Sequence, residues 1–409
     1  MNKKTQIKEK KQKNAIFYKK IMLTLNILFY VYIIKHKKRN VGVIMKDLKD
    51  IRKNINEVDK QMAKLFEERM ELAKLVALYK KENALAIEDK VREKEILANN
   101  VNYIENQDVK EYYVNFMQDV MNISKQYQSR IMKGMKIAYC GVEGAFSHIA
   151  TKKLFASQVL LPFSNFTEAY RAVEKGYCDA CVLPIENSHA GDVGSVMDLI
   201  FSGSLYINNI VDVDIVHNLI AKKGVKLSQI KKVASHPQAI AQCQKFLQKY
   251  NFEIVECSNT AIAAMDLANS NDETCAVIAS EDVVRLYDLE ILESNINESR
   301  NNTTRFAVFS RALNTQRKAN KMGEHFILVF TVLNEAGALA KTLNIIGAHN
   351  FNMRTLRSRP MKELQWNYYF FVELDGDINS TDGKEMIQEL RSVCDRLKIV
   401  GTYYSFVER

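Results

Sequence analysis

The N-terminal part of the chain carries its apolar residues at helical spacing. Residues 46–131 contain neither Gly nor Pro, and apolar side chains recur every three or four positions. The first stripe consists of Leu48, Ile51, Ile55, Val58, Met62, Leu65 and Phe66. It loosens at Asn83, a second helix is expected from about Asp89, and a third over about residues 109–131. The pattern predicts an all-α domain over residues 45–132, whose thin core favours helix exchange between two chains.

Beyond this region, short apolar runs alternate with amphipathic segments. Residues 137–140 form an expected strand, and a glycine turn leads from it into a helix opened by Ser147. Thr167 is expected to cap the next helix, and the following strand, residues 180–183, is expected to end at Pro184. Strands that alternate with helices of about 10–15 residues imply a largely parallel sheet.

The C-terminal part has a different element order. Residues 314–323 are polar and basic and are expected to form a linker after an α/β domain over residues 135–313. Strand and helix patterns then alternate as βαββαβ over residues 324–409, which is the ferredoxin-like arrangement. The chain is therefore expected to hold three folded domains, within the range that its 409 residues allow.

The net charge of +10 suggests nucleic-acid binding until the charge is located. Residues 1–44 carry 12 Lys or Arg and one acid, Glu9, so the rest of the chain sums to about −1. A nearly neutral body does not favour a phosphate-binding surface. No nucleic-acid partner is therefore expected.

An apolar run at residues 21–34 is flanked by lysines. Its 14 residues are fewer than the roughly 20 that span a bilayer, and no small-residue cleavage motif follows it. Three interpretations remain for residues 1–44. Translation begins at Met45, or the segment anchors the protein to an anionic membrane surface, or it is a soluble tail.

Seven cysteines without framework spacing suit a reduced cytosol. The pair Cys178 and Cys181 stands alone, and Cys181 opens an apolar run, so buried free thiols are expected rather than zinc or redox use. His148, His189 and His217 stand singly, and the sequence shows no metal-ligand spacing. We expect neither a metal nor an organic cofactor.

Three short polar blocks lie at turns or at the ends of apolar runs. They are Pro-Ile-Glu-Asn-Ser at residues 184–188, Ser-His-Pro-Gln at 235–238 and Thr-Thr-Arg-Phe at 303–306. Such side chains are costly to bury unpaired, which indicates a polar ligand site. In this order and spacing, and with the glycine turn at 141–147, they resemble prephenate dehydratase over residues 135–312. The turn lacks the third glycine of a dinucleotide fingerprint, so NAD binding is not expected.

The resemblance to prephenate dehydratase implies two α/β lobes, like a periplasmic binding protein, with the site in the cleft. It implies that prephenate loses water and carbon dioxide to give phenylpyruvate, and that Thr304 assists departure of the ring hydroxyl. Arg305 is a candidate for carboxylate binding or a structural residue, and Glu186 is an acid–base residue or a partner for an internal cation. The other residues expected at the site are Asn187, Ser188, Ser235, Gln242 and Phe306.

A set of polar residues on or beside the helical stripe resembles the active site of the all-helical chorismate mutases that are fused to prephenate dehydratase. The set is Arg52, Arg69, Lys80, Asp89, Arg92, Glu93, Ser124 and Gln128. The resemblance implies rearrangement of chorismate to prephenate, which needs a bound dicarboxylate and stabilised charge on the ether oxygen, but no nucleophile.

Within this set, Arg69 would bind one carboxylate, and Arg52 from the other subunit of a dimer would bind the second. Lys80 and Gln128 would donate hydrogen bonds to the ether oxygen. The other four residues would hold the ring hydroxyl, orient the cations or add positive potential.

The C-terminal unit resembles an ACT domain, the small-molecule sensor attached to many enzymes of amino-acid biosynthesis. The turn that contacts the ligand corresponds to Gly337, Ala338 and Leu339. Where phenylalanine-sensing members carry Glu-Ser-Arg-Pro, this chain has Arg357, Ser358, Arg359 and Pro360. Either the missing acid is needed and sensing weakens, or the position is peripheral and inhibition survives. We expect phenylalanine binding to be retained.

Together, the resemblances predict a cytoplasmic homodimer that converts chorismate to prephenate and then to phenylpyruvate under control by phenylalanine. A different class, an amino-acid sensor with inactive catalytic sites, is the alternative. It is disfavoured because Thr304 and the mutase set are both intact. A membrane-tethered form of the enzyme depends on residues 1–44.

Overall fold

The computed structural model describes residues 47–299, 301–314, 323–361 and 367–404. The basic extension over residues 1–44 and most of the expected linker lie outside the described residues. The chain divides into two units after Arg69, a position inside the first described helix.

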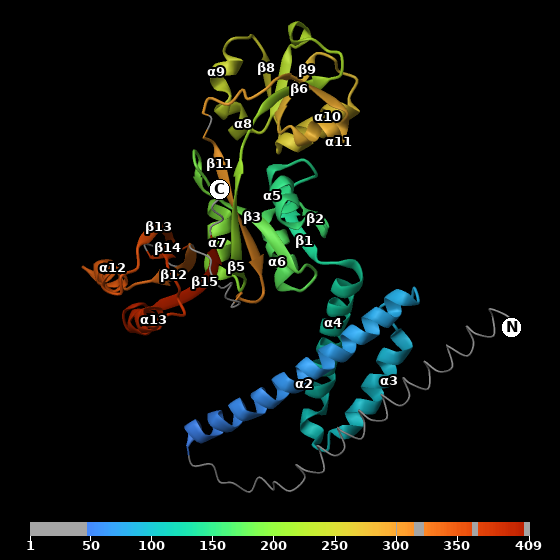
Figure 1. Cartoon of the computed structure of the whole chain (residues 1–409), viewed down its shortest axis with the longest axis vertical. Coiled ribbons are helices and arrows are strands. Elements are labelled where there is room, and N and C mark those ends of the chain that lie inside the picture. Colours follow the sequence, from blue (N-terminus) through green and yellow to red (C-terminus); the bar gives the residue numbers. More distant parts are fainter. Residues whose placement is uncertain (1–46, 300, 315–322, 362–366, 405–409) are drawn as a thin grey trace, which may run out of the picture. The chain divides into compact units, whose positions relative to one another are not determined.

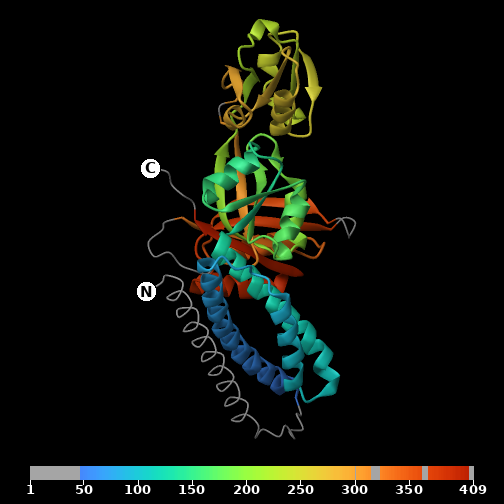
Figure 2. The same ribbon diagram turned by 90° about the vertical axis from the view of Figure 1, so that its right-hand side faces the viewer.

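The helical region contains three α-helices, as the apolar spacing predicts. They are α2 (Leu48–Glu82), α3 (Lys90–Asn100) and α4 (Lys110–Lys133), with 3-10 turns at Val101–Tyr103 and Gln107–Val109. Asp89 caps α3 by accepting a hydrogen bond from Arg92 N, and Gly134 ends α4 at a φ of 88°. Helix α3 packs beside α4 (Figure 2).

The following region forms two α/β lobes. In the first lobe, the strands run in the order β5-β11-β3-β1-β2, and helices α5 to α7 pack against them (Figure 1). The strands are β1 (Lys136–Cys140), β2 (Val159–Phe163), β3 (Ala180–Asn187), β4 (Gly191–Asp192), β5 (Tyr206–Asp214) and β11 (Thr303–Ser310). The helices are α5 (Phe146–Phe155), α6 (Phe166–Glu174) and α7 (Gly194–Ser202).

The second lobe has a sheet in the order β10-β6-β9-β7-β8. Its strands are β6 (Asn218–Lys222), β7 (Lys232–Ser235), β8 (Glu253–Glu256), β9 (Cys275–Ala279) and β10 (Leu289–Glu293). Its helices are α8 (Pro237–Gln242), α9 (Gln244–Leu247), α10 (Thr260–Asn269) and α11 (Asp282–Tyr287), with a 3-10 turn at Leu227–Gln229.

The expectation of a largely parallel sheet is wrong for the strands that join the lobes. Strand β1 is parallel to β2 and β3, but β11 is antiparallel to both β3 and β5. The chain leaves the first lobe through β5, builds the second lobe and returns through β11, so these two strands run in opposite directions.

The C-terminal region has the element order βαββαβ. Its elements are β12 (Glu324–Thr331), α12 (Ala338–Ala348), β13 (Met353–Pro360), β14 (Tyr368–Asp375), α13 (Thr381–Val393) and β15 (Arg396–Tyr404). The strand order is β13-β14-β12-β15, and β15 touches β5 through Gly401 and Ile207. A Cβ on Gly401 would lie 1.9 Å from Ile207 O, so the two strands meet only because residue 401 has no side chain.

Three local expectations are wrong. Strand β3 does not end at Pro184 but continues to Asn187, because Pro184 lies where the β3–β11 register shifts and its missing N–H is tolerated. Helix α5 starts at Phe146 rather than at Ser147. Helix α6 is capped by Asn165, which accepts from Glu168 N, so Thr167 lies inside the helix.

All seven cysteines are free, and none is exposed. Burial raises the pKa of Cys140 to about 11 and that of Cys243 to about 12, which keeps both thiols protonated and unreactive. Among the described residues, no helix has both the length and the apolar character needed to cross a bilayer.

Candidate active sites

Thr304 and Asn187 face each other on neighbouring strands of the first lobe. The register of β11 and β3 sets Thr304 opposite Asn187. Asn187 Nδ2 donates a 2.9 Å hydrogen bond to Thr304 Oγ1, so the threonine hydroxyl keeps its own proton for another acceptor. Both side chains are buried, with exposures of 6% for Asn187 and 8% for Thr304. A threonine held in this way can donate a hydrogen bond to a departing oxygen.

The amide of Asn187 is fixed by bonds on both of its polar atoms. Its Oδ1 accepts from His189 N at 3.0 Å and from Ala190 N at 2.9 Å, within the turn that joins β3 to β4. Its Nδ2 also donates to Asn302 Oδ1 at 2.8 Å. The orientation of Asn187, and with it the position of Thr304 Oγ1, therefore depends on this turn.

The hydrogen-bond network continues into the second lobe. Asn302 Nδ2 donates to Gln242 Oε1 at 2.9 Å, and the same oxygen lies 3.0 Å from His217 Nε2. His217 is 2% exposed, and burial lowers its pKa, although the bond to Gln242 opposes this shift. A neutral His217 with its proton on Nε2 can therefore hold Gln242 in place.

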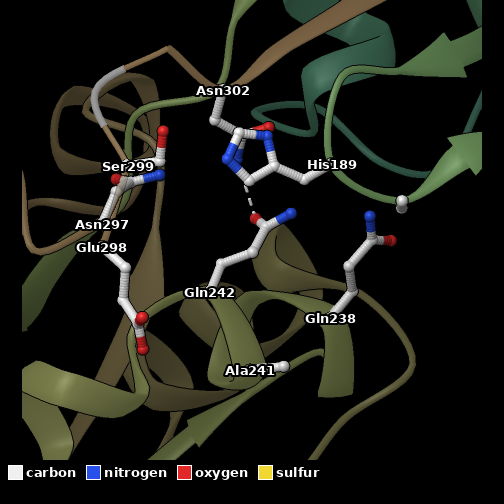
Figure 3. A pocket seen from close by; sticks show the side chains of 9 residues that line it. His189, Gln238, Ala241, Gln242, Asn297, Glu298, Ser299 and Asn302 are labelled. Carbon is white, nitrogen blue, oxygen red and sulfur yellow. Dashed lines mark hydrogen bonds between the residues drawn. The ribbon is translucent and has the colours of Figure 1, made fainter.

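A cavity of about 280 Å³ lies along this network. His189 and Asn302 project into it from one side, and Gln238 and Gln242 project from α8 on the other (Figure 3). The lining is therefore built from both lobes and is rich in amide donors. Such groups can bind carboxylate and hydroxyl oxygens, as a polar substrate in a cleft requires.

Other expected dehydratase residues have supporting positions. Ser188 Oγ accepts from Thr303 N at 3.0 Å and donates to Asn301 O at 3.1 Å, which ties the end of β3 to the start of β11. Ser235 is completely buried and donates to Ile278 O, so it joins β7 to β9. Phe306 is 2% exposed and belongs to the apolar core of the first lobe.

Glu186 and Arg305 are bound to the C-terminal region. Arg305 donates to both carboxylate oxygens of Glu373, at 2.9 and 3.0 Å, and to Tyr403 Oη at 3.0 Å. Glu186 lies 3.4 Å from Arg305 NH1 and 2.5 Å from Arg357 NH2. Of the interpretations that the sequence left open, these contacts favour a structural Arg305 and a Glu186 that pairs with internal cations.

Most residues of the expected mutase set are tied to nearby groups, from Lys80 near the end of α2 to Glu93 on α3 and Ser124 on α4. Lys80 Nζ donates to Ile87 O at 2.6 Å, and Glu93 forms a 3.0 Å ion pair with Lys125. Ser124 is buried and donates to Val120 O at 2.8 Å. Arg92, by contrast, forms an exposed pair with Glu95 at 3.1 Å.

Gln128 is the buried residue of this set with an unsatisfied polar atom. Its side chain is 9% exposed, and Oε1 has no hydrogen-bond partner among the described residues. An unpaired buried amide is costly, so this position suits a group that bonds to a ligand. On α2, Arg69 is half-buried and burial lowers its pKa, whereas Arg52 is exposed.

Within the part of the chain that the structure describes, no element covers the apolar stripe of α2. Its side chains have exposures of 38–57%, and they are Leu48, Ile51, Ile55, Val58, Met62, Leu65 and Phe66. A stripe of this length normally packs against another helix.

Of the residues expected at the sensor site, the segment 357–360 contacts the first lobe. Arg357 pairs with Glu186 and Asp192, and Arg359 lies 3.4 Å from Asp198. Ser358 and Pro360 belong to the same strand, β13, and pair with β14. The expected ligand-contacting turn begins at Gly337, which directly precedes α12 and has a φ of 83°. Ala338 and Leu339 lie in the first turn of that helix.

Three residues in or beside this hydrogen-bond network were not selected as site residues from the sequence. His217, His189 and Asn302 stand outside any spacing typical of catalytic or metal sites, and they come together only in the folded chain, next to the ends of β6, β3 and β11. Asn302 directly precedes Thr303-Thr304-Arg305, which was the one local signal available. Within the described ranges, no cluster of three His, Cys, Asp or Glu side chains could hold a metal ion.

Comparisons with known proteins agree with this geometry. Residues 137–314 match the family model of prephenate dehydratase, and residues 51–129 match that of chorismate mutase type II. A curated relative from Buchnera aphidicola, named bifunctional chorismate mutase/prephenate dehydratase, is 31% identical over 87% of this chain and 95% of its own.

Two solved structures show a similar fold over 66% of this chain. A prephenate dehydratase from Arthrobacter aurescens in complex with L-Phe has a TM-score of 0.61 and 27% identity over 90% of its length. A protein described as a novel type of quorum-quenching acylase has the same TM-score and identity over 98% of its length. With both family models matched in order, the chain belongs to the bifunctional chorismate mutase/prephenate dehydratase family.

Proposed function

We propose that the lobed region converts prephenate to phenylpyruvate at the cavity beside Thr304. The observation that carries the proposal is the hydrogen bond from Asn187 Nδ2 to Thr304 Oγ1, because it uses the hydroxyl as an acceptor and leaves its proton for a substrate oxygen. As the ring hydroxyl departs, this proton stabilises the leaving oxygen, and the ring carboxylate leaves as carbon dioxide. The amides of Gln242 and Asn302 would hold the substrate.

The helical region would supply the prephenate. In the rearrangement of chorismate, Lys80 and Gln128 would donate to the ether oxygen, where negative charge develops. The buried, unpaired amide of Gln128 supports this role. Arg69 and Arg52 would bind the carboxylates, and Asp89, Arg92, Glu93 and Ser124 would orient these groups and the ring hydroxyl.

The helical region would work as a homodimer. The exposed stripe of α2 supports this proposal, because a second copy offers a matching apolar surface. Arg52 lies on the same helix and is exposed, so a partner copy could take it into its own site. The dimer would thus complete the mutase site as well as cover the apolar stripe.

The C-terminal region would act as an ACT domain that binds phenylalanine. Its βαββαβ order and the Arthrobacter aurescens dehydratase in complex with L-Phe support this proposal. The domains would span residues 45–132, 135–313 and 324–409. An enzyme that converts chorismate and prephenate, with seven free thiols, would suit the cytoplasm.

The two activities can be tested separately on the purified full chain. With chorismate supplied, we expect chorismate to disappear and phenylpyruvate to form, and phenylalanine to alter the second rate. Thr304→Ala should stop the sequence at prephenate, with a loss of dehydratase rate of about 10²-fold or more, whereas Thr304→Ser should retain most of it. If chorismate is untouched while phenylalanine binds, the protein is a sensor and the proposal fails.

A further inference from the structure

A pair of carboxylates lies directly behind the Asn187–Thr304 pair. Because side chains alternate along a strand, Glu186 and Arg305 point to the opposite face of the sheet from Asn187 and Thr304. On the other side of β3, the short strand β4 sets Asp192 opposite Glu186. Two like charges that face each other across paired strands repel, so the β3–β4 hairpin needs a cation to close.

Arg357 of β13 supplies that cation. Its NH2 lies 2.5 Å from Glu186 Oε1, and its NH1 lies 2.9 Å from Asp192 Oδ1. The side chain of Arg357 is only 14% exposed, and its guanidinium lies over the ring of Phe371 at 5.7 Å. One arginine therefore bridges both carboxylates of the hairpin in a site that is largely shielded from water.

Closing the hairpin matters because its turn orients Asn187. The β3–β4 pairing also sets Asn187 opposite Gly191. Between them lie His189 and Ala190, whose N–H groups hold Asn187 Oδ1. If Glu186 and Asp192 moved apart, the turn would open, and the amide that donates to Thr304 would lose its orientation.

A second ion pair anchors the same strands to the C-terminal region. Glu373 is 1% exposed at its side chain and is bound by both terminal nitrogens of Arg305. Burial acts to raise the pKa of Glu373, but the hydrogen bonds and charge of Arg305 hold it below its ordinary value. The carboxylate therefore stays charged, and β14 remains tied to the residue next to Thr304.

We infer that Arg357 is a positioning residue for the dehydratase reaction: it neutralises Glu186 and Asp192 and so keeps the β3–β4 turn closed around Asn187. The C-terminal region thus contributes a group to catalysis without touching the substrate. This inference rests on the proposed dehydratase function of the cavity beside Thr304.

The test uses the full chain with prephenate supplied directly, so that the mutase step is bypassed. Arg357→Gln should lower the dehydratase kcat about 10-fold and change KM less than about 2-fold, because the turn is misplaced while the cavity lining remains. Arg357→Lys should recover part of the loss. Arg391→Gln, an exposed arginine on α13, is the matched control and should leave kcat unchanged.

Charge removal distinguishes this role from general destabilisation. Adding Asp192→Asn to Arg357→Gln should restore kcat to within about 2-fold of the parent, because the repulsion across the hairpin is gone. Chorismate mutase activity of the same samples reports that the chain is folded and should not change. The inference is overturned if Arg357→Gln keeps the parental kcat, or if Asp192→Asn fails to restore it. A parent that forms no phenylpyruvate from prephenate would instead refute the proposed function.

Discussion

The lobed region and the helical region differ in how they bring the polar residues of their candidate sites together. In the lobed region, the pairing of β3 with β11 brings Asn187 beside Thr304 and the preceding Asn302, from a distant part of the same chain. In the helical region, the described bonds of Lys80 and Ser124 are to nearby backbone, Gln128 Oε1 is unpaired among the described residues, and the stripe of α2 is exposed. A sheet can close a site within one chain, whereas an amphipathic helix with an exposed apolar stripe offers that face to another surface.

The largest effect should come from changing Asn187 to Asp. The carboxylate keeps the acceptor for the turn but cannot donate to Thr304 Oγ1, so we expect the dehydratase rate to fall about 10³-fold. The mutase rate should not change. Asn209→Asp on β5 is the matched control, because Asn209 uses its Oδ1 as an acceptor from Ile210 N. Equal losses in both variants would contradict this account of Asn187.

A charge placed on the apolar stripe of α2 should have the reverse effect, lowering the mutase rate and sparing the dehydratase rate. Val58 is 55% exposed in the apolar stripe, and Val58→Asp would disrupt a dimer that forms there. We expect the mutase rate to fall about 10²-fold and the dehydratase rate to change less than about 2-fold. Sedimentation should show loss of the dimer. Glu57→Ala, on the same helix and outside the stripe, should alter neither; parental mutase activity in a monomeric Val58→Asp would refute the shared site.

Sequence patterns predicted the helices of both regions better than the contacts that build the sites. The period of the α2 stripe gave that helix directly, because helical spacing is a local property. Pro184 was expected to end β3, and this error hid the segment that sets Glu186 and Asn187 opposite Arg305 and Thr304.

Arg357 illustrates a second limit. The sequence alone shows that Arg357 stands where phenylalanine-sensing ACT domains carry Glu. Its partners Glu186 and Asp192, however, are more than 160 residues away, and only the packed structure identifies them. The sequence did not indicate a role for His217 either, because that role follows from its burial and its hydrogen bond with Gln242. Local patterns therefore predict elements, while pairs between distant residues decide the chemistry.

A smaller effect should follow from the buried His217 of the lobed region. Its pKa lies below 6.5 when folded, so the unfolded chain binds more protons as pH falls below that value. Stability of this region should therefore decrease on acidification, by at most about 1.4 kcal/mol per pH unit from this group. His217→Gln keeps a donor for Gln242 without titrating, and thermal unfolding across this pH range should show a shallower dependence. An unchanged slope would exclude His217 as the source.

The smallest effect concerns Lys398 on β15. Its Nζ donates to Ile200 O at 2.8 Å and to Gly203 O at 2.5 Å, at the end of α7. Burial, assisted by Arg396, lowers the pKa of Lys398 to about 8. Lys398→Met should reduce the free energy of unfolding by about 1 kcal/mol and leave the dehydratase kcat unchanged.

The same pKa fixes the sign of the pH dependence at Lys398. Between about pH 8 and 10.5, the unfolded chain binds more protons than the folded chain, so the parent gains stability as pH rises through this window. Lys398→Met lacks this gain, and the difference between the two proteins should widen with pH. A constant difference would contradict the assignment.

Mixing two inactive variants tests most directly whether the mutase site is shared between copies. Arg52→Ala and Lys80→Ala should each abolish chorismate mutase activity, while both keep the dehydratase rate as a control for folding. After the two are mixed and allowed to exchange subunits, about a quarter of the parental mutase activity should return, because half of the dimers are mixed and each of these has one intact site. A mixture as inactive as its components would show that each chain builds its own mutase site.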